Sequence, residues 1–310
     1  AGYDVILTKS VHQIPRPNAY VADWKRIIEY MPTLRYKQLD ALKIFETFDN
    51  ARISCPTGWG KTHVMTIASR LFWHAKIAIA TSRTEVIEQR IFPVLDRMLP
   101  DVGLVRAGKR KKSNRVTCYC SKSLHHADGD EDILFIDEGH EAAAPDYAQK
   151  LVKFHHARIF MFSASWDMRP DGTDLRATAF GGPIRLKVTY QEAVEHGMIV
   201  PLVVQVTHVP GSDICDGITN DTEKERVGIW SNEHRNRLIA NDANIYGRDV
   251  QTLITVKTLE HALYLHKMLP HFQLVYDHKS QHDGTWGNFR NRGLIGDDFK
   301  ILDTDGRMRL

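Results

Sequence analysis

The chain has 310 residues, enough for two domains of ordinary size, and a formal net charge of +3. Its apolar share of 43% and its charged share of 25% are those of a globular protein, which excludes a wholly disordered or collagen-like chain. The mildly basic charge permits a nucleic-acid partner without requiring one.

Cysteine usage and hydropathy indicate in which cell compartment the protein is expected. The four cysteines form no CxxC pair, so we expect free thiols in a reducing cytoplasm and no zinc site. No apolar run approaches the roughly 18 residues needed to span a membrane, and the N-terminus lacks the basic start and apolar core of a signal peptide. The chain begins "AGYDVIL" without a methionine, so we expect a processed, excised or fragmentary gene product.

The first predicted domain follows a mixed N-terminal extension, residues 1–33, that has a short helical stretch at 23–31. Across 34–200, apolar runs typical of strands alternate with helical patterns. Most of the strand runs are apolar throughout, as in a parallel sheet buried on both faces, which predicts an α/β domain. The strand runs are 51–55, 75–81, 102–108, 115–121, 132–137 and 157–165, and the clearest helical patterns are 61–73 and 84–99.

A second α/β domain is predicted over residues 201–310. Its first strand is expected at 202–209, and a long polar helical stretch follows at about 219–247. A strand–helix–strand unit should come next. We expect this second domain to be incomplete, because a full one would need several more strands. The strand–helix–strand unit is expected at 250–256, 258–269 and 272–278.

The stretch "SCPTGWGKTHV" at 54–64 matches most of the phosphate-loop pattern G-x-x-x-x-G-K-[ST]. Cys55 stands at the first position. A strand precedes the loop and an amphipathic helix follows it, which is the context that the pattern requires. The loop is therefore predicted to bind the phosphates of a nucleotide through Pro56, Thr57, Gly58, Trp59, Gly60, Lys61 and Thr62.

Each of these residue types has a chemical role in such a loop. Gly58 and Gly60 let the main chain turn with its amides pointing inward. Lys61 places a positive charge against the β- and γ-phosphates, and the Thr62 hydroxyl can ligate Mg²⁺. The ring of Trp59 is expected to point away from the phosphates and toward the second domain. The predicted cofactors are ATP and Mg²⁺.

An acidic pair follows the apolar run in "DILFIDEGH", where the carboxyl end of a parallel strand is expected. Open α/β sheets bind their ligands at that edge. Asp137 is predicted to hold Mg²⁺, and Glu138 to polarise the water that attacks the γ-phosphate. Together with Lys61 these two carboxylates form the predicted catalytic set.

"PTGWGKT" together with "DEGH", a variant of the D-E-x-H box, resembles superfamily 2 helicases and translocases. "GGPIRLKVTYQEAVEHGMIVPL" resembles the stretch that joins the motor domains in the type III restriction and DNA-translocase branch. The resemblance implies two RecA-like domains that couple ATP hydrolysis to movement along nucleic acid. "QTLITVKTLEHALYL" resembles motif IV of the second domain, so the resemblance covers about residues 34–275.

Further motifs of the family can be placed on this chain. "LRYKQ" resembles the adenine-recognition motif, with Arg35 and Gln38 in matching positions, which implies that the Gln38 amide reads the adenine edge. "FSAS" resembles the motif that couples the ATP site to domain movement. This implies that Ser163 and Ser165 bond to the D-E-x-H carboxylates and to His140.

"AIATSRTEVIEQR" resembles motif Ia, which touches the nucleic-acid backbone. The resemblance implies backbone contacts by Thr81, Ser82, Arg83 and Gln89. In the next motif, Cys120 stands where a threonine is expected. "GKRKKSNR" holds Lys109, Arg110, Lys111, Lys112 and Arg115, which could contact phosphates or form a solvated surface loop.

The family's motifs V and VI, the latter with arginines that reach the γ-phosphate, have no match here. "TDGRMRL", with Arg307 and Arg309, resembles the approach to motif V. We therefore expect this chain alone to bind ATP but to hydrolyse it poorly. The paired histidines at 125–126 and 155–156 are expected to be surface or structural residues.

The sequence thus predicts an ATP-dependent helicase or translocase that binds the backbone of nucleic acid with little sequence preference, with DNA favoured over RNA. A motor subunit of a restriction or nuclease system, with a partner subunit, is one alternative. A non-motor fragment that binds ATP and nucleic acid is another. A small-molecule P-loop kinase is disfavoured, because it needs neither the "FSAS" motif nor a second α/β domain of this kind.

Overall fold

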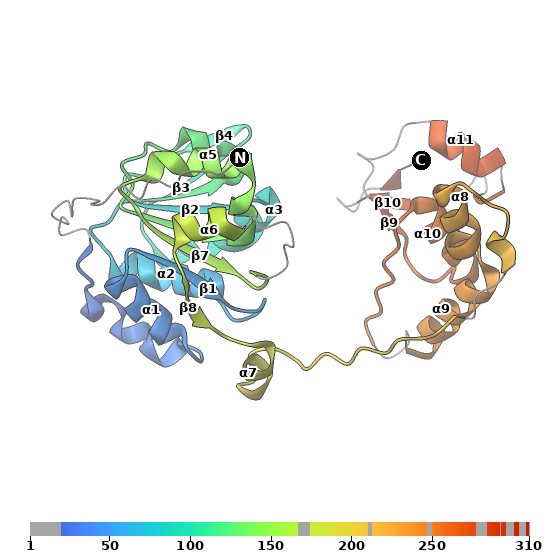
Figure 1. Cartoon of the computed structure of the whole chain (residues 1–310), viewed down its shortest axis with the longest axis horizontal. Coiled ribbons are helices and arrows are strands. Elements are labelled where there is room, and N and C mark those ends of the chain that lie inside the picture. Colours follow the sequence, from blue (N-terminus) through green and yellow to red (C-terminus); the bar gives the residue numbers. More distant parts are fainter. Residues whose placement is uncertain are drawn as a thin grey trace, which may run out of the picture. The chain divides into compact units, whose positions relative to one another are not determined.

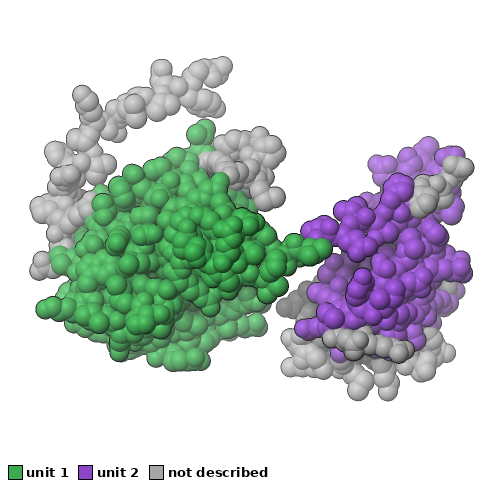
Figure 2. Space-filling view, turned by 90° about the horizontal axis from the view of Figure 1, so that it is seen from below, with its two compact units in different colours: residues 1–203 green, residues 204–310 purple. Residues whose placement is uncertain are grey.

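The computed structural model describes residues 20–166, 174–209, 213–246, 250–276, 284–291, 293–295, 301–303 and 308–309. The chain divides into two compact units, residues 1–203 and 204–310 (Figure 2). Within the described residues, no helix is both long and apolar enough to cross a membrane.

Unit 1 is built on one eight-stranded sheet in the order β4-β3-β5-β2-β6-β7-β1-β8 (Figure 1). All neighbouring strands run parallel except β3 and β4, which form an antiparallel hairpin. The predicted α/β class with a parallel sheet is confirmed. The strands are β1 (Asn50–Ser54), β2 (Ile77–Thr81), β3 (Val102–Arg106), β4 (Lys109–Lys111), β5 (Val116–Cys120), β6 (Ile133–Asp137), β7 (Arg158–Ser163) and β8 (Ile184–Lys187).

Helices cover both faces of this sheet. One face packs against α1, α2, α4 and a 3-10 helix, and the other against α5 and α6. The bounds are α1 (Gln38–Thr47), α2 (Lys61–Leu71), α3 (Thr84–Val86), α4 (Phe92–Met98), α5 (Pro145–Leu151), α6 (Asp174–Gly181) and α7 (Tyr190–Glu195), with the 3-10 helix at Trp24–Thr33.

Side-chain alternation along the central strands explains why these runs are apolar throughout. On β2, Ile77 and Ile79 face the core of the α1–α2 side, whereas Ala78 and Ala80 face the α5–α6 side. Successive side chains of a strand point to opposite faces, so a strand covered on both faces needs apolar residues at every position. The small alanines let the helices of the second layer approach closely.

Unit 2 is a smaller α/β body. It holds a three-stranded sheet in the order β11-β10-β9, in which β9 and β10 run parallel. Two apolar clusters lie around α10. The elements are α8 (Asp221–Glu225), α9 (Glu233–Tyr246), α10 (Leu259–Met268), β9 (Val275–Tyr276), α11 (Gly284–Asn291), β10 (Ile301–Asp303) and β11 (Met308–Arg309).

Two strands expected from the sequence do not form. Residues 202–209 and 250–256 are in no strand, although both carry strand-like sequences. Val203 and Leu253 are 89% and 85% exposed, and no described strand pairs with either stretch, although Ile254 packs against an apolar cluster of unit 2. β-propensity describes how well a side chain fits a pleated, half-buried surface, and it does not create that surface.

Candidate nucleotide-binding site

The predicted phosphate loop lies between the end of β1 and the start of α2, at the carboxyl edge of the sheet. Gly58 and Gly60 have φ angles of +91° and +100°, in the region that favours glycine. A Cβ at Gly58 would lie 2.8 Å from Ile199 Cγ2, and one at Gly60 would lie 2.7 Å from Gln38 Nε2. Only glycine therefore fits at either position without displacing its neighbours.

Gln38 fastens the loop from behind. Its side chain is fully buried, and Nε2 donates to the carbonyl of Trp59 at 2.7 Å. Its Oε1 accepts from the main-chain N–H of Arg35 at 2.9 Å, and the Arg35 guanidinium donates to the carbonyl of Gly58 at 3.0 Å. Both the donor and the acceptor of the Gln38 amide are thus bonded to the main chain in this structure. The family resemblance implies instead that this amide reads adenine.

Trp59 is also an anchor of the loop. The side chain is fully buried in the core of unit 1, and its indole N–H donates to the carbonyl of Tyr36 at 2.9 Å. The expectation that the ring points toward the second domain is therefore wrong. The physical reason is that an indole buries a large apolar area and its N–H needs an acceptor when buried, and unit 1 supplies both.

Lys61 forms ion pairs with both predicted carboxylates. Its ammonium lies 3.0 Å from Asp137 Oδ1 and 2.8 Å from Glu138 Oε1. Burial alone lowers the pKa of Lys61, but the two carboxylates outweigh burial and raise that pKa above its ordinary value. Asp137 Oδ1 is buried, and the Lys61 ammonium at 3.0 Å is its one partner among the described residues. One carboxylate oxygen is thus left with bonding capacity.

The acidic turn after β6 has a constrained main chain. Glu138 adopts a left-handed conformation with φ of 54°, which is uncommon outside glycine. Gly139 lies so close to β7 that an added Cβ would be 2.7 Å from Met161 Cβ and from the Trp166 ring. Trp166 is itself held by a hydrogen bond from its indole to the carbonyl of Ile53 at 3.1 Å. This packing fixes the main-chain position from which the Glu138 side chain extends.

A short hydrogen-bond chain joins the acidic turn to the phosphate loop through β7. His140 Nδ1 lies 2.8 Å from Ser163 Oγ and 3.5 Å from Glu138 Oε2. Ser163 Oγ accepts from the main-chain N–H of Ser165 at 3.0 Å, and the Ser163 carbonyl accepts from the N–H of Cys55 at 3.0 Å. Ser165 contributes its main chain to this chain of contacts.

The residues present fit a nucleotide phosphate with Mg²⁺. The glycine turn and the N-terminus of α2 supply inward main-chain donors, which suit phosphate oxygens. Thr62 and Asp137 supply a hydroxyl and a carboxylate, the hard oxygen ligands that Mg²⁺ prefers. The buried Asp137 oxygen with bonding capacity is the observation that favours a cation there.

A cavity of about 320 Å³ lies beside the loop, lined by Arg35, Tyr36, His196, Gly197 and Met198. The rings of Tyr36 and His196 stack at a centroid distance of 3.7 Å and an angle of 15°. Sequence reasoning missed His196. The glycine after it, with φ of +63°, marks the end of α7, but no signal in the sequence links that end to Tyr36.

The predicted nucleic-acid contacts of motif Ia differ in accessibility. Thr81 is fully buried and so does not reach the surface, whereas Arg83 and Gln89 are exposed after β2. Ser82 is half-buried, and its carbonyl accepts from the Cys120 thiol at 3.7 Å. Contacts by Ser82, Arg83 and Gln89 stay predictions.

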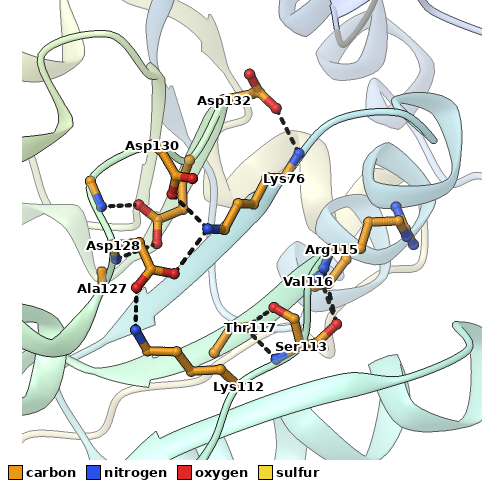
Figure 3. A network of polar contacts seen from close by, with 12 residues as sticks. Lys76, Lys112, Ser113, Arg115, Val116, Thr117, Ala127, Asp128, Asp130 and Asp132 are labelled. Carbon is orange, nitrogen blue, oxygen red and sulfur yellow. Dashed lines mark hydrogen bonds and ion pairs between the residues drawn. The ribbon is translucent and has the colours of Figure 1, made fainter.

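The basic loop forms the exposed hairpin of β3 and β4, and Lys112 pairs with Asp128. Lys76 Nζ contacts both Asp128 and Asp130, at 2.9 and 2.6 Å (Figure 3). Glu131 accepts the main-chain N–H of Asp128 at 3.0 Å. The three carboxylates are thus already bonded to lysine side chains and main-chain N–H groups, which indicates a structural role. Arg307 and the Arg309 side chain lie outside the described residues.

Comparisons with known proteins find similarity in sequence and in fold. Residues 31–167 match the family model described as "Type III restriction enzyme, res subunit". A point variant of S. cerevisiae Dbp5, bound to RNA and ADP BeF3, aligns with a TM-score of 0.51 and 14% identity, over 90% of this chain and 72% of that one. This alignment shows that the chain shares the RecA-like α/β fold of that structure.

Two other helicase structures align as well. The UvsW helicase of bacteriophage T4 is 16% identical, with a TM-score of 0.43, over 53% of this chain and 67% of that one. The Hef helicase domain of Pyrococcus furiosus is 15% identical, with a TM-score of 0.46, over 87% of this chain. The chain spans 56% of the length of the Hef structure. No curated protein matches its sequence.

Proposed function

We propose that the chain binds ATP with Mg²⁺, hydrolyses it slowly by itself because it has no match to motif VI, and couples hydrolysis to movement along nucleic acid, with DNA favoured over RNA. The contact of Lys61 with both Asp137 and Glu138, at the mouth of a glycine turn, carries the proposal. Lys61 begins α2, which follows β1, whereas Asp137 ends β6 and Glu138 comes directly after it; β7 lies between β1 and β6 in the sheet. Their convergence at one edge is what phosphoryl transfer requires.

The residues have distinct roles in this proposal. Lys61 exchanges its carboxylate partners for the β- and γ-phosphates when the nucleotide enters. Glu138 is then free to orient and polarise the attacking water, a role that needs a carboxylate near the γ-phosphate. Thr62 and Asp137 would hold Mg²⁺, which would supply positive charge against the phosphates.

The coupling between the nucleotide site and movement is assigned to the His140–Ser163 contact. His140 touches both Glu138 and Ser163, and the Ser163 main chain holds the start of the loop through Cys55. A movement of the Glu138 carboxylate can therefore be transmitted to the ends of β7 and β1. Arg83 and Gln89, exposed at the same edge, are the proposed contacts to the nucleic-acid backbone.

The proposal is tested by measuring ATP hydrolysis with and without single-stranded DNA or RNA. Glu138→Gln should reduce kcat by roughly 100-fold or more, the range that general base catalysis contributes, while ATP binding persists. Glu195→Gln is the matched control, because Glu195 is exposed on α7 and bonds only to Gln191 among the described residues. Hydrolysis that Glu138→Gln leaves unchanged would exclude the proposed role of the acidic turn.

A second candidate function is that of the motor subunit of a restriction system. The match of residues 31–167 to the restriction-enzyme family model favours it. In that case ATP hydrolysis should be stimulated by double-stranded DNA rather than by single strands or RNA. Equal stimulation by RNA would exclude the restriction motor while leaving the helicase proposal intact.

A further inference from the structure

The amide of Gln38 lies beneath the phosphate loop, with no atom at the surface of the protein. The residue is 0% exposed, and its Nε2 donates to the carbonyl of Trp59 at 2.7 Å. A Cβ placed on Gly60 would lie 2.7 Å from the same nitrogen, so the loop covers the amide closely. A ligand on the surface of the loop therefore has no contact with Gln38 in this arrangement.

Turning the Gln38 amide outward would leave buried polar groups without partners. Its Oε1 accepts from the main-chain N–H of Arg35 at 2.9 Å, so both halves of the amide are bonded inside the protein. Moving the side chain to a base would take the donor from the Trp59 carbonyl and the acceptor from the Arg35 N–H. Buried polar groups without partners cost free energy, which new bonds to a base would first have to offset.

Residues 35–38 also fix two consecutive carbonyls of the loop. The Arg35 guanidinium donates to the carbonyl of Gly58 at 3.0 Å, and Gln38 donates to the next carbonyl, that of Trp59. In a trans peptide the C=O and the following N–H point in opposite directions, and the described residues contain no cis peptide bond. The N–H of Gly60 therefore points away from Gln38, as a phosphate loop requires of its donors.

A base attached to phosphates in the loop would lie in the cavity of about 320 Å³ beside it, and Gln38 does not line this cavity. Reading adenine takes a donor and an acceptor at matched spacing, which a single amide supplies. None of the five residues that line the cavity has an amide or a carboxyl side chain. They are Arg35, Tyr36, His196, Gly197 and Met198.

Several polar groups at this cavity are bonded to other partners. The main-chain N–H groups of residues 196–198 donate to carbonyls of α7. The Tyr36 hydroxyl donates to Glu192 at 3.1 Å, and the Tyr36 ring is stacked on that of His196. A base would thus meet aromatic and apolar surface together with the guanidinium of Arg35, which only donates. Every base carries an acceptor for such a donor, so this contact does not select one base.

We propose that the nucleotide site accepts nucleoside triphosphates irrespective of their base, and that Gln38 is a positioning residue of the phosphate loop rather than a reader of adenine. This inference rests on the proposed function, because it requires that the loop binds a nucleotide. Recognition then comes from the groups that all four triphosphates share, which are the phosphates held by the loop, by Lys61 and by the N-terminus of α2.

The first test is calorimetric titration of the full chain with ATP, GTP, CTP and UTP, each with Mg²⁺. The four dissociation constants should agree within about 10-fold, whereas a site that bonds to one base rejects the others by roughly 10⁴-fold or more. A wider spread, with ATP bound most tightly, would overturn the inference and leave the proposed function intact. Binding of none of the four would overturn both.

Gln38→Ala separates the two roles of the amide. If Gln38 positions the loop, the substitution should weaken the binding of ATP and of GTP by the same factor, about 5-fold for the lost hydrogen bond. A loss for ATP alone would show that Gln38 reads adenine and would overturn the inference. Gln149→Ala is the matched control, because Gln149 is an exposed glutamine on α5, which covers the other face of the sheet. It should leave both affinities unchanged.

Gln38→Glu provides a second variant. It keeps the length of the side chain and the acceptor for the Arg35 N–H, but it removes the donor to the Trp59 carbonyl. Variants that keep the circular dichroism spectrum of the parent but bind ATP and GTP as tightly as the parent would overturn the positioning role. The titration of the unmutated chain does not depend on the folding of either variant.

Discussion

The two ends of helix α2 place positive groups in opposite electrostatic surroundings. At the N-terminal end, Lys61 is neutralised by Asp137 and Glu138, and its pKa is raised. At the C-terminal end, Arg70 lies beside Arg115, whose pKa is lowered. The helix dipole favours cations at the C-terminus and disfavours them at the N-terminus. The charges that surround each end therefore outweigh the helix in setting how each cation behaves.

The largest effect should come from removing the cation at the N-terminal end. Lys61→Met leaves two neighbouring carboxylates without their partner, one of them buried. Breaking such a buried pair costs about 3–5 kcal/mol of unfolding free energy, and nucleotide binding should be lost with it. Urea unfolding followed by fluorescence measures the first effect, and nucleotide titration measures the second. Unchanged stability would contradict the ion pairs seen here.

The entry to α2 should be the next most sensitive position. Gly60→Ala places a side chain at a φ of +100° and 2.7 Å from Gln38 Nε2, so the buried bond from Gln38 to Trp59 must move. Strain of this kind costs on the order of 1–3 kcal/mol. Gly108→Ala, at a φ of +76° with open space around it, carries the strain without the clash and serves as the control. The two variants should differ in thermal unfolding temperature.

Removing a cation at the C-terminal end should cost far less. Arg115→Met replaces a partly buried charge that has no carboxylate partner among the described residues by an apolar chain of similar length. Such replacements are often neutral, so we expect a change within about 1 kcal/mol. Urea unfolding of the Lys61→Met and Arg115→Met variants side by side measures the contrast. Equal destabilisation by the two substitutions would contradict the difference in charge surroundings between the two ends of α2.

The smallest effect concerns an ion pair away from α2, between Lys37 and Glu192 at 2.6 Å. The hydrogen bond from Lys37 is the main cause that lowers the pKa of Glu192 from 4.5 to about 2. The unfolded chain therefore takes up a proton first, so this pair stabilises the fold above pH 4.5 and is lost as the pH falls toward 2. Glu192→Gln should flatten the acid dependence of unfolding in that window. An unchanged acid profile would show that the pair contributes nothing.

The sequence predicted that Lys61, Asp137 and Glu138 come together, because the signals for this arrangement are local. A glycine turn between a strand and an amphipathic helix, and an acidic pair after an apolar run, each occupy fewer than a dozen neighbouring residues. The topology of a parallel sheet then brings both to one edge, where Lys61 meets Asp137 and Glu138. The parallel α/β class followed from the same apolar runs.

Features that depend on distant partners were not predictable in this way. The hydrogen bond of Gln38 to the loop, the burial of Trp59 and the stacking of Tyr36 on His196 join residues whose spacing in the chain has no pattern. The missing strands in 202–209 and 250–256 show the converse. Their residues suit a strand, but a strand forms only where a neighbour supplies the pairing.

The burial of Trp59 has a kinetic consequence. A loop tied to the core by an indole ring and by the Gln38 amide loses little conformational freedom when a ligand arrives. A nucleotide bound as proposed would meet a loop whose main chain already has its bound conformation. The slow event in capture should then be the release of the Lys61 ammonium from Asp137 and Glu138, so nucleotide association should respond to charge at that lysine more than to loop flexibility.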